Sequence, residues 1–220
     1  MNAAAPLRLV VLISGRGSNM VAIARACASG TLGARVVRVL SDEPAAGGLA
    51  LARELGLEAG VVARAGFPDR AAFEAALVAA IEAARPDLVV LAGFMRVLSP
   101  AFTARYAGRL LNIHPSLLPA YRGLHTHERV LAAGDREHGA SVHFVTAELD
   151  GGPLVLQARV PVLPGDGVAS LSARVQQREH IIYPKVIGWI AAARLHQADG
   201  AAWLDGRRLD VPLTDGVDAP

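Results

Sequence analysis

The sequence is poor in cysteine and in long apolar runs. Cys27 is its sole cysteine, which excludes an internal disulfide and a zinc site built from several cysteines. No apolar run approaches the roughly 20 residues that a transmembrane helix requires, and Met1–Pro6 lacks the basic and apolar regions of a signal peptide. These absences predict a cytoplasmic protein with no membrane partner.

The sequence also lacks a large excess of either positive or negative charge. The chain has 22 basic and 20 acidic residues, a formal net charge of +2, and Lys185 as its only lysine. Because no run of Arg or Lys is present, we expect no nucleic-acid partner, although a local anion site stays open. Apolar residues make up 52% of the sequence, which is ample for a packed core.

Short apolar runs alternate with helical patterns in the first half of the chain. The runs are typical of strands buried on both faces: Leu7–Ile13, Ala34–Leu40, Leu57–Ala63, Leu88–Ala92 and Leu110–Ile113. Helices are expected over residues 19–29 and 47–55, and in the segment that begins at Pro68 and Asp69. Repeated strand–helix–strand units predict an α/β fold, a Rossmann-like doubly wound sheet that is mainly parallel.

The second half predicts an antiparallel C-terminal part. Ser141–Thr146 and Pro153–Val160 are strand-like and are separated by the turn sequence Leu149–Gly152. Val168–Arg194 is mainly helical, and we expect Pro184 to kink or divide that helix.

We expect one domain over residues 1–220. Its N-terminal, phosphate-binding half spans about 7–113, its C-terminal half about 114–209, and residues 210–220 form a frayed tail. Asp205-Gly206 predicts a small hairpin within Trp203–Leu209.

The loop Ser14–Asn19, after the first strand, is the first candidate site. Its glycines permit a tight turn, and amides at a helix N-terminus favour an anion such as phosphate. An ordinary strand-to-helix turn is the alternative. A dinucleotide site would use Asp42 to bind a ribose, but Met20 stands where the third glycine of that fingerprint belongs. The loop therefore favours a phosphomonoester over a dinucleotide.

The second candidate lies at the end of the fifth strand. Asn112 and His114 are two residues apart, so alternation points both to one side of the strand, at the sheet edge where ligands bind. An amide beside an imidazole suits a developing oxyanion. A core histidine and an asparagine that caps a turn fit the local sequence equally well.

Asp150 is the third candidate, although an aspartate before two glycines is ordinary turn chemistry. Placed against His114, its carboxylate would favour the protonated imidazole. A metal site is the competing interpretation of the histidine-rich middle of the chain, which contains His114, His125, His127, His138 and His143. The spacing of these histidines matches no common zinc pattern, so we expect no metal.

Several segments, in order, resemble one known family. They are Val11–Asn19, Leu91–Arg96, Asn112–Pro119, Tyr121–His127, His138–Phe144 and Leu149–Pro153. Together they resemble the folate-dependent phosphoribosylglycinamide formyltransferases, and the likeness runs over about Leu7–Leu209. It implies the formyltransferase fold and a one-carbon transfer in purine biosynthesis. The formyl group of 10-formyltetrahydrofolate would pass to the amine of glycinamide ribonucleotide through a tetrahedral oxyanion.

The resemblance also implies roles for individual residues. Asn112 would stabilise the oxyanion, His114 would be the acid, and Asp150 the essential carboxylate. The substrate would contact the first loop and a later helix, at Gly17, Ser18, Asn19, Gln176, Gln177, Arg178 and Glu179. The folate would contact Arg70, Met95, Arg96, Val97, Leu98, Asn112, Thr146, Ala147, Glu148, Leu149 and Asp150.

Departures from the family pattern are confined to loops. Arg16 occupies a variable position of the phosphate loop, and Arg122 stands where some family members have proline. The oligomeric state is open, and a monomer or weak homodimer is expected.

Related activities remain as alternatives. Methionyl-tRNA formyltransferase and formyltetrahydrofolate hydrolase share the core but normally carry a further domain, and Gly123–His127 favours the purine enzyme over both. A non-catalytic nucleotide or folate sensor is the remaining alternative, but it would not need the set Asn112, His114 and Asp150.

Overall fold

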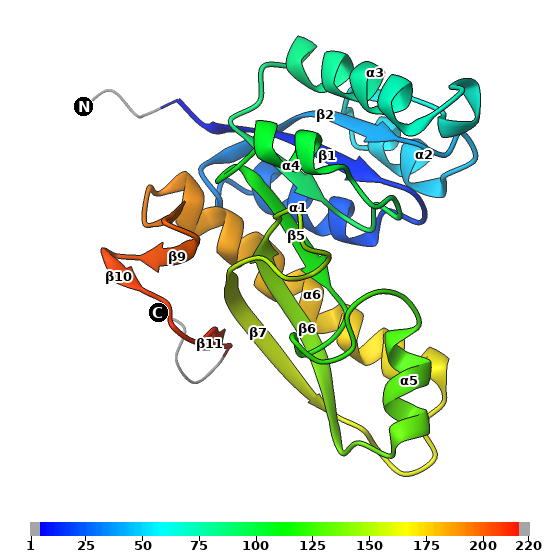
Figure 1. Cartoon of the computed structure of the whole chain (residues 1–220), viewed down its shortest axis with the longest axis vertical. Helices are drawn as coiled ribbons and strands as arrows, with labels where there is room; N and C mark the ends of the chain where they lie inside the picture. The colour runs from blue at the N-terminus through cyan, green and yellow to red at the C-terminus, as the bar shows by residue number, and fades with distance from the viewer. Residues whose placement is uncertain (1–4, 216–220) are drawn as a thin grey trace. The chain divides into compact units, whose positions relative to one another are not determined.

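The computed structural model describes residues 5–215. The chain divides into two compact units, Met1–Leu111 and Asn112–Pro220, and the division falls inside strand β5 (Leu110–His114). Most of the helices and strands are labelled along the chain in Figure 1. No helix in the described part of the chain combines the length and apolar character needed to cross a membrane. The expectation of a single domain with two halves stays a prediction.

Parallel strands form the sheet of the first unit, in the order β4-β1-β2-β3. They are β1 (Leu7–Ile13), β2 (Ala34–Ser41), β3 (Ala59–Val61) and β4 (Leu88–Leu91). Leu9–Ile13 and the whole of β4 are buried, as expected for central strands covered on both faces. The sequence therefore located these strands correctly, and β3 is shorter than expected.

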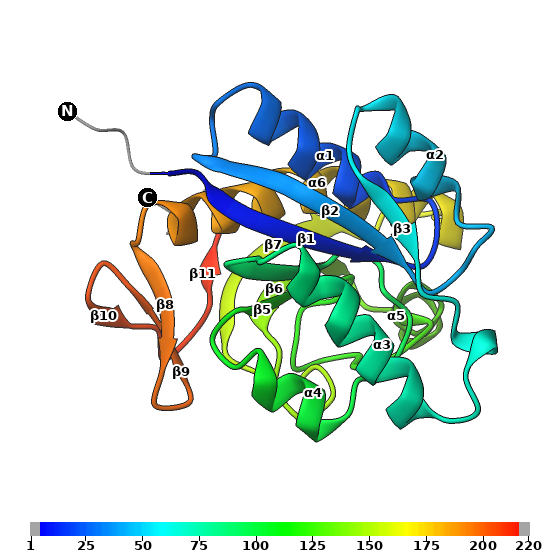
Figure 2. The same ribbon diagram turned by 90° about the horizontal axis from the view of Figure 1, so that it is seen from above.

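The first unit's helices connect these strands. They are α1 (Ser18–Ala28), α2 (Gly47–Glu54), α3 (Arg70–Ala83) and α4 (Pro100–Arg105), with a 3-10 turn η1 (Arg64–Gly66). In Figure 2, α1 and α2 lie on one side of β1 and β2, and α3 lies on the other. This is the doubly wound arrangement, in which the order reverses between β1 and β4.

Local chemistry accounts for where α3 and α4 begin. Asp69 caps α3 by accepting a hydrogen bond from the Ala72 amide at 2.8 Å. Ser99 caps α4 by accepting one from the Phe102 amide at 3.2 Å, and Pro100 occupies its first turn. Helix α4 was not expected from the sequence, because it is too short to produce a helical apolar pattern.

In the second unit, strands lie in the order β11-β7-β6-β5. They are the end of β5, β6 (Glu137–Phe144), β7 (Leu154–Pro161) and β11 (Leu213–Thr214), and β6 and β7 form the expected antiparallel hairpin. The helices of this unit are α5 (Thr126–Ala133) and α6 (Val168–Ala191). A separate antiparallel sheet contains β8 (Leu195–Ala198), β9 (Ala201–Leu204) and β10 (Arg207–Arg208). The fold class is thus confirmed: a mainly parallel central sheet with an antiparallel C-terminal part.

The expected frayed tail is wrong for residues 213–215. Leu213 and Thr214 pair with β7, and the Asp215 carboxylate lies 2.5 Å from Arg178 Nη2 and 3.4 Å from Lys185 Nζ. These long-range contacts order a segment that looks featureless in sequence. Residues 216–220 of the expected tail lie outside the described residues.

Pro184 does not divide α6, which runs unbroken from Val168 to Ala191. Proline lacks the amide that would donate to the carbonyl four residues earlier, which weakens the helix locally. The buried face of α6, which includes Ile182 and Val186, packs on β6 and β7, and that packing compensates for the lost hydrogen bond.

A histidine pair joins α5 to β6 in the second unit. His127 Nδ1 lies 3.0 Å from His138 Nε2, and the two rings are nearly perpendicular, at 85°. Burial lowers the pKa of His127 and lowers that of His138 to about 4. Both imidazoles are therefore neutral at neutral pH, and one ring donates an N–H to the other.

We predict that the free energy of unfolding falls as the pH drops from about 6.5 to about 4. The unfolded histidine binds a proton over this range, whereas folded His138 does not, so protonation favours the unfolded chain. Urea unfolding at several pH values should show a smaller loss in His138→Gln, by on the order of 1 kcal/mol. The exposed His125, replaced by Gln, is the matched control. Equal pH dependence in all three proteins would refute this role for His138.

Candidate active site

In the first unit, the two predicted ligand-binding segments emerge at the same sheet edge. Ser14–Asn19 follows β1 and residues 93–98 follow β4, and these strands are parallel neighbours. The Ser14 amide donates to the Gly93 carbonyl at 3.1 Å, and the Met95 amide donates to Ser14 Oγ at 2.8 Å. The predicted phosphate loop and the predicted folate segment therefore lie side by side, where open α/β sheets bind ligands.

The phosphate loop requires glycine at its turn. Gly17 precedes α1 with φ of 74°, and a Cβ added there would lie 2.8 Å from the Gly48 Cα of α2. The Gly17 carbonyl accepts the first helical hydrogen bond, from the Val21 amide at 2.9 Å. The N-terminus of α1, with its partial positive charge, thus opens at the loop, as an anion site requires.

The structure argues against the dinucleotide alternative. The Asp42 side chain is 1% exposed, and its carboxylate already accepts hydrogen bonds from Ser14 Oγ and from the Arg96 guanidinium. It is therefore not available to bind a ribose. Met20, which stands where a third glycine would belong, is fully buried in the core.

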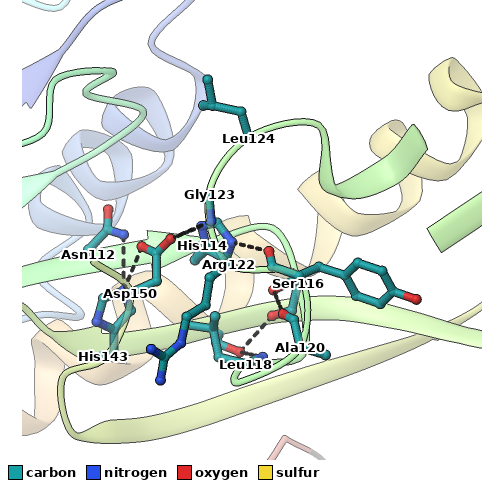
Figure 3. Close-up of polar contacts among 12 residues, drawn as sticks. Asn112, His114, Ser116, Leu118, Ala120, Arg122, Gly123, Leu124, His143 and Asp150 are labelled. Atoms are coloured by element: carbon teal, nitrogen blue, oxygen red, sulfur yellow. Dashed lines mark hydrogen bonds and ion pairs between the residues drawn. The ribbon is translucent and has the colours of Figure 1, made fainter. Parts of the chain in front are cut away.

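Asn112 and His114, at the end of β5, lie in the second unit with Asp150. Figure 3 shows the Asp150 carboxylate with His143 and Asn112 on one side and His114 and Gly123 on the other. His114 is 7% exposed, and its Nδ1 lies 3.6 Å from Asp150 Oδ2. The structure therefore brings the three predicted catalytic residues together, while their roles stay predictions.

The backbone determines the orientation of His114. A carbonyl oxygen can only accept a hydrogen bond, so the 2.9 Å contact with the Tyr121 carbonyl places a proton on His114 Nε2. The remaining nitrogen, Nδ1, is the one that faces Asp150. When His114 is protonated, the N–H at Nδ1 is therefore the one that faces the Asp150 carboxylate.

Asp150 is held in an uncommon backbone conformation. Its φ is 49°, and its Oδ2 accepts a hydrogen bond from the Gly123 amide at 2.9 Å. Two residues later, a Cβ at Gly152 would lie 1.9 Å from the Phe144 carbonyl oxygen. Gly152 thus lets the turn close against β6, which sets where the Asp150 carboxylate points.

His143 orients Asn112, a role that the sequence analysis missed. Burial lowers the pKa of His143, so its ring is neutral. His143 Nδ1 donates to the Phe144 carbonyl at 2.9 Å, which leaves Nε2 to accept from Asn112 Nδ2 at 3.1 Å. The 3.8 Å contact between His143 and Asp150 is for the same reason not an ion pair. The signal available in the sequence was the placement of polar Ser141 and His143 at alternate positions of a strand-like segment.

The loop predicted to close over the folate, Thr146–Asp150, is held at two points. Glu148 forms an ion pair with Arg122, and Asp150 accepts the Gly123 amide. Leu149 lies between these points and is 51% exposed. Arg122 therefore supplies the charged contact to this loop.

The remaining predicted substrate residues lie on α6, and Arg70 lies at the start of α3. Glu179 is buried, whereas the Arg178 guanidinium contacts Asp215 of the C-terminal segment. Arg70 is largely exposed, with Nε 3.9 Å from Glu74 Oε1. Within residues 5–215, no three His, Cys, Asp or Glu side chains are grouped so that they could hold a metal ion.

The chain is similar to known formyltransferases over most of its length. Residues 7–187 match the family described as formyl transferase. The phosphoribosylglycinamide formyltransferase of Escherichia coli is 55% identical over 203 residues, which cover 92% of this chain and 96% of that protein. The enzyme of the same name from Haemophilus influenzae is 45% identical, and the aligned region covers 92% of this chain and 95% of that protein.

A solved structure supports the same relationship. The phosphoribosylglycinamide formyltransferase from Coxiella burnetii superimposes with a TM-score of 0.90 at 47% identity, covering 94% of this chain and 99% of that one. The sheet order, the loops at its edge and the grouping of Asn112, His114 and Asp150 agree with this similarity. The chain belongs to the formyl transferase family.

Proposed function

We propose that the protein transfers the formyl group of 10-formyltetrahydrofolate to the amine of glycinamide ribonucleotide, a step of purine biosynthesis. The grouping of Asn112 and His114 with a buried carboxylate, Asp150, is the observation that carries the proposal. The names of the matched relatives support the same reaction.

The chemistry follows from what each group can donate. The substrate amine attacks the formyl carbon, and the electron pair of the C=O bond moves onto oxygen. Asn112 uses one Nδ2–H on His143 and keeps its second for the oxyanion. Protonated His114 adds a positive charge, which Asp150 stabilises from 3.6 Å. Collapse then breaks the carbon–N10 bond, the amine loses a proton, and N10 of the folate gains one.

The predicted binding residues fit the two ligands. We assign the phosphate to Gly17, Ser18 and Asn19, at the N-terminus of α1. The ribose and glycinamide are assigned to residues 176–179 of α6: Gln176, Gln177, Arg178 and Glu179. We keep Arg178 in this set of substrate-binding residues, and its guanidinium also forms an ion pair with Asp215.

The folate is assigned to apolar surface with polar groups at its edges. Met95 and Val97 are 65% and 61% exposed in the first unit, and Leu149 is 51% exposed in the second. Exposed apolar side chains beside backbone amides suit a flat pterin ring. Arg70 and Arg96 are the charged residues of this assignment.

The remaining expectations concern the whole protein. We propose a single formyltransferase domain that acts in the cytoplasm as a monomer or weak homodimer. We further propose that it works without a metal ion and has only small-molecule substrates as partners, with no nucleic acid.

The first prediction concerns the acceptor. Loss of 10-formyltetrahydrofolate, followed by absorbance, should require glycinamide ribonucleotide, because the amine of that substrate is the proposed nucleophile and acceptor of the formyl group. Turnover that ignores the acceptor would indicate a hydrolase. No turnover under either condition would indicate a non-catalytic sensor.

The second prediction concerns Asp150→Asn. The amide oxygen still accepts from Gly123, but the charge that stabilises protonated His114 is lost, so we expect kcat to fall roughly 100-fold or more. Dissociation constants of both substrates, measured by calorimetry, should change by no more than about threefold. Glu137→Gln, which removes an exposed charge from the same unit, is the control. A loss of binding equal to the loss of kcat would contradict the proposed role.

The third prediction concerns His143→Phe. A phenyl ring fills the imidazole space but cannot accept from Asn112, so the amide loses its orientation. We expect kcat to fall roughly tenfold, a smaller loss than removal of an oxyanion donor causes. Tetrahydrofolate affinity and the thermal midpoint should stay close to wild type, and an unchanged kcat would show that Asn112 needs no such partner.

A further inference from the structure

Two buried carboxylates of the first unit have no part in the chemistry described above. Asp42 is 2% exposed and Glu74 is 8% exposed. Burying a charged carboxylate is unfavourable unless hydrogen bonds and opposite charge compensate for lost hydration. Both acids contact one short segment, residues 95–99, and Asp42 also contacts Ser14.

Asp42 holds the beginning of this segment. Its Oδ1 accepts from Ser14 Oγ at 2.5 Å, and its Oδ2 forms an ion pair with the Arg96 Nε. Ser14 Oγ in turn accepts from the Met95 amide at 2.8 Å. One carboxylate at the end of β2 therefore fixes two successive residues, Met95 through Ser14 and Arg96 directly.

Glu74, on α3, holds the end of the same segment. Its Oε1 accepts from the Ser99 amide at 2.8 Å, and its Oε2 accepts from the Ser99 hydroxyl. Ser99 also caps α4 through the Phe102 amide. The segment is therefore held by a charged acceptor at each end.

The residues between the two anchors are apolar and exposed. Met95 is 65% exposed and Val97 is 61% exposed, although burial of either side chain would be favourable. The Arg96 guanidinium also lies 3.9 Å from Glu43, so its charge is balanced by the two acids that follow β2, Asp42 and Glu43. Arg96 thus acts here as a tether for the backbone, and the anchors keep the apolar side chains facing outward.

We propose that Asp42 and Glu74 are positioning residues that hold Met95–Leu98 in its folate-binding conformation before the folate arrives. The inference rests on the proposed function, because it assumes that this segment contacts the folate. Neither acid touches the ligand. They act through Met95, Arg96 and Ser99, and they lower the entropy lost when the segment becomes ordered around a ligand.

Asp42→Asn tests the first anchor. The amide oxygen can still accept from Ser14, which preserves the start of the phosphate loop, but the ion pair with Arg96 is lost. We expect the KM for 10-formyltetrahydrofolate to rise about tenfold. The KM for glycinamide ribonucleotide and the kcat at saturation should stay within about twofold. Glu54→Gln is the matched control: it removes the same charge from an exposed residue at the end of α2 and should leave all three values unchanged.

Glu74→Gln tests the second anchor, and amide hydrogen exchange supplies a readout that does not depend on activity. The variant keeps one acceptor for Ser99 and loses the charge, so it should also raise the folate KM selectively. Exchange at the amides of Met95 and Ser99 should be faster in Asp42→Asn and Glu74→Gln than in the control Glu54→Gln.

The outcomes separate the inference from the proposed function. An unchanged folate KM in both variants overturns the inference, and so does unchanged exchange at the two amides. A fall in kcat together with a rise in both KM values and a lower thermal midpoint would mean that the two acids only stabilise the fold. That result also overturns the inference. A wild-type protein that transfers no formyl group contradicts the proposed function, and the exchange measurement then still decides whether the two acids hold the segment.

Discussion

The contact between the Asp150 carboxylate and His114 is the interaction on which the proposed chemistry depends. An imidazolium stabilises an oxyanion with a full positive charge, and a carboxylate beside the ring balances that charge. The 3.6 Å separation exists because the Gly123 amide and the tight turn at Gly152 hold Asp150 in place. Backbone groups of the second unit therefore set the orientation of the Asp150 carboxylate and of the His114 imidazole.

Acidic side chains also hold an irregular segment of the first unit in place. Asp42 and Glu74 are buried, and each accepts hydrogen bonds that connect it to the segment after β4. A charged acceptor binds an amide more strongly than a neutral one does, so few contacts suffice to hold an irregular segment. In each unit, then, a buried acid replaces the regular hydrogen bonds that a helix or strand would have supplied.

The neutral histidines of this protein act as hydrogen-bond partners and carry no charge. His143 is neutral because it is buried, and for that reason it can accept from Asn112 and orient the amide. His127 and His138 are neutral for the same reason and join α5 to β6. The histidine-rich composition that first suggested a metal thus has a hydrogen-bonding explanation in most of its members.

The local sequence by itself determined strands β1 to β7, most of the helices, the glycine-rich turn after β1 and the common side of Asn112 and His114, because these follow from side-chain periodicity and backbone conformational limits. Asp150 looked like a turn residue, and only the family resemblance suggested its role. Tertiary structure alone decided that Asp150 reaches His114, that His143 orients Asn112, that Asp42 is bound rather than open to a ribose, and that residues 213–215 are ordered. Each of these contacts joins residues far apart in the chain, and local propensity carries no information about such pairs.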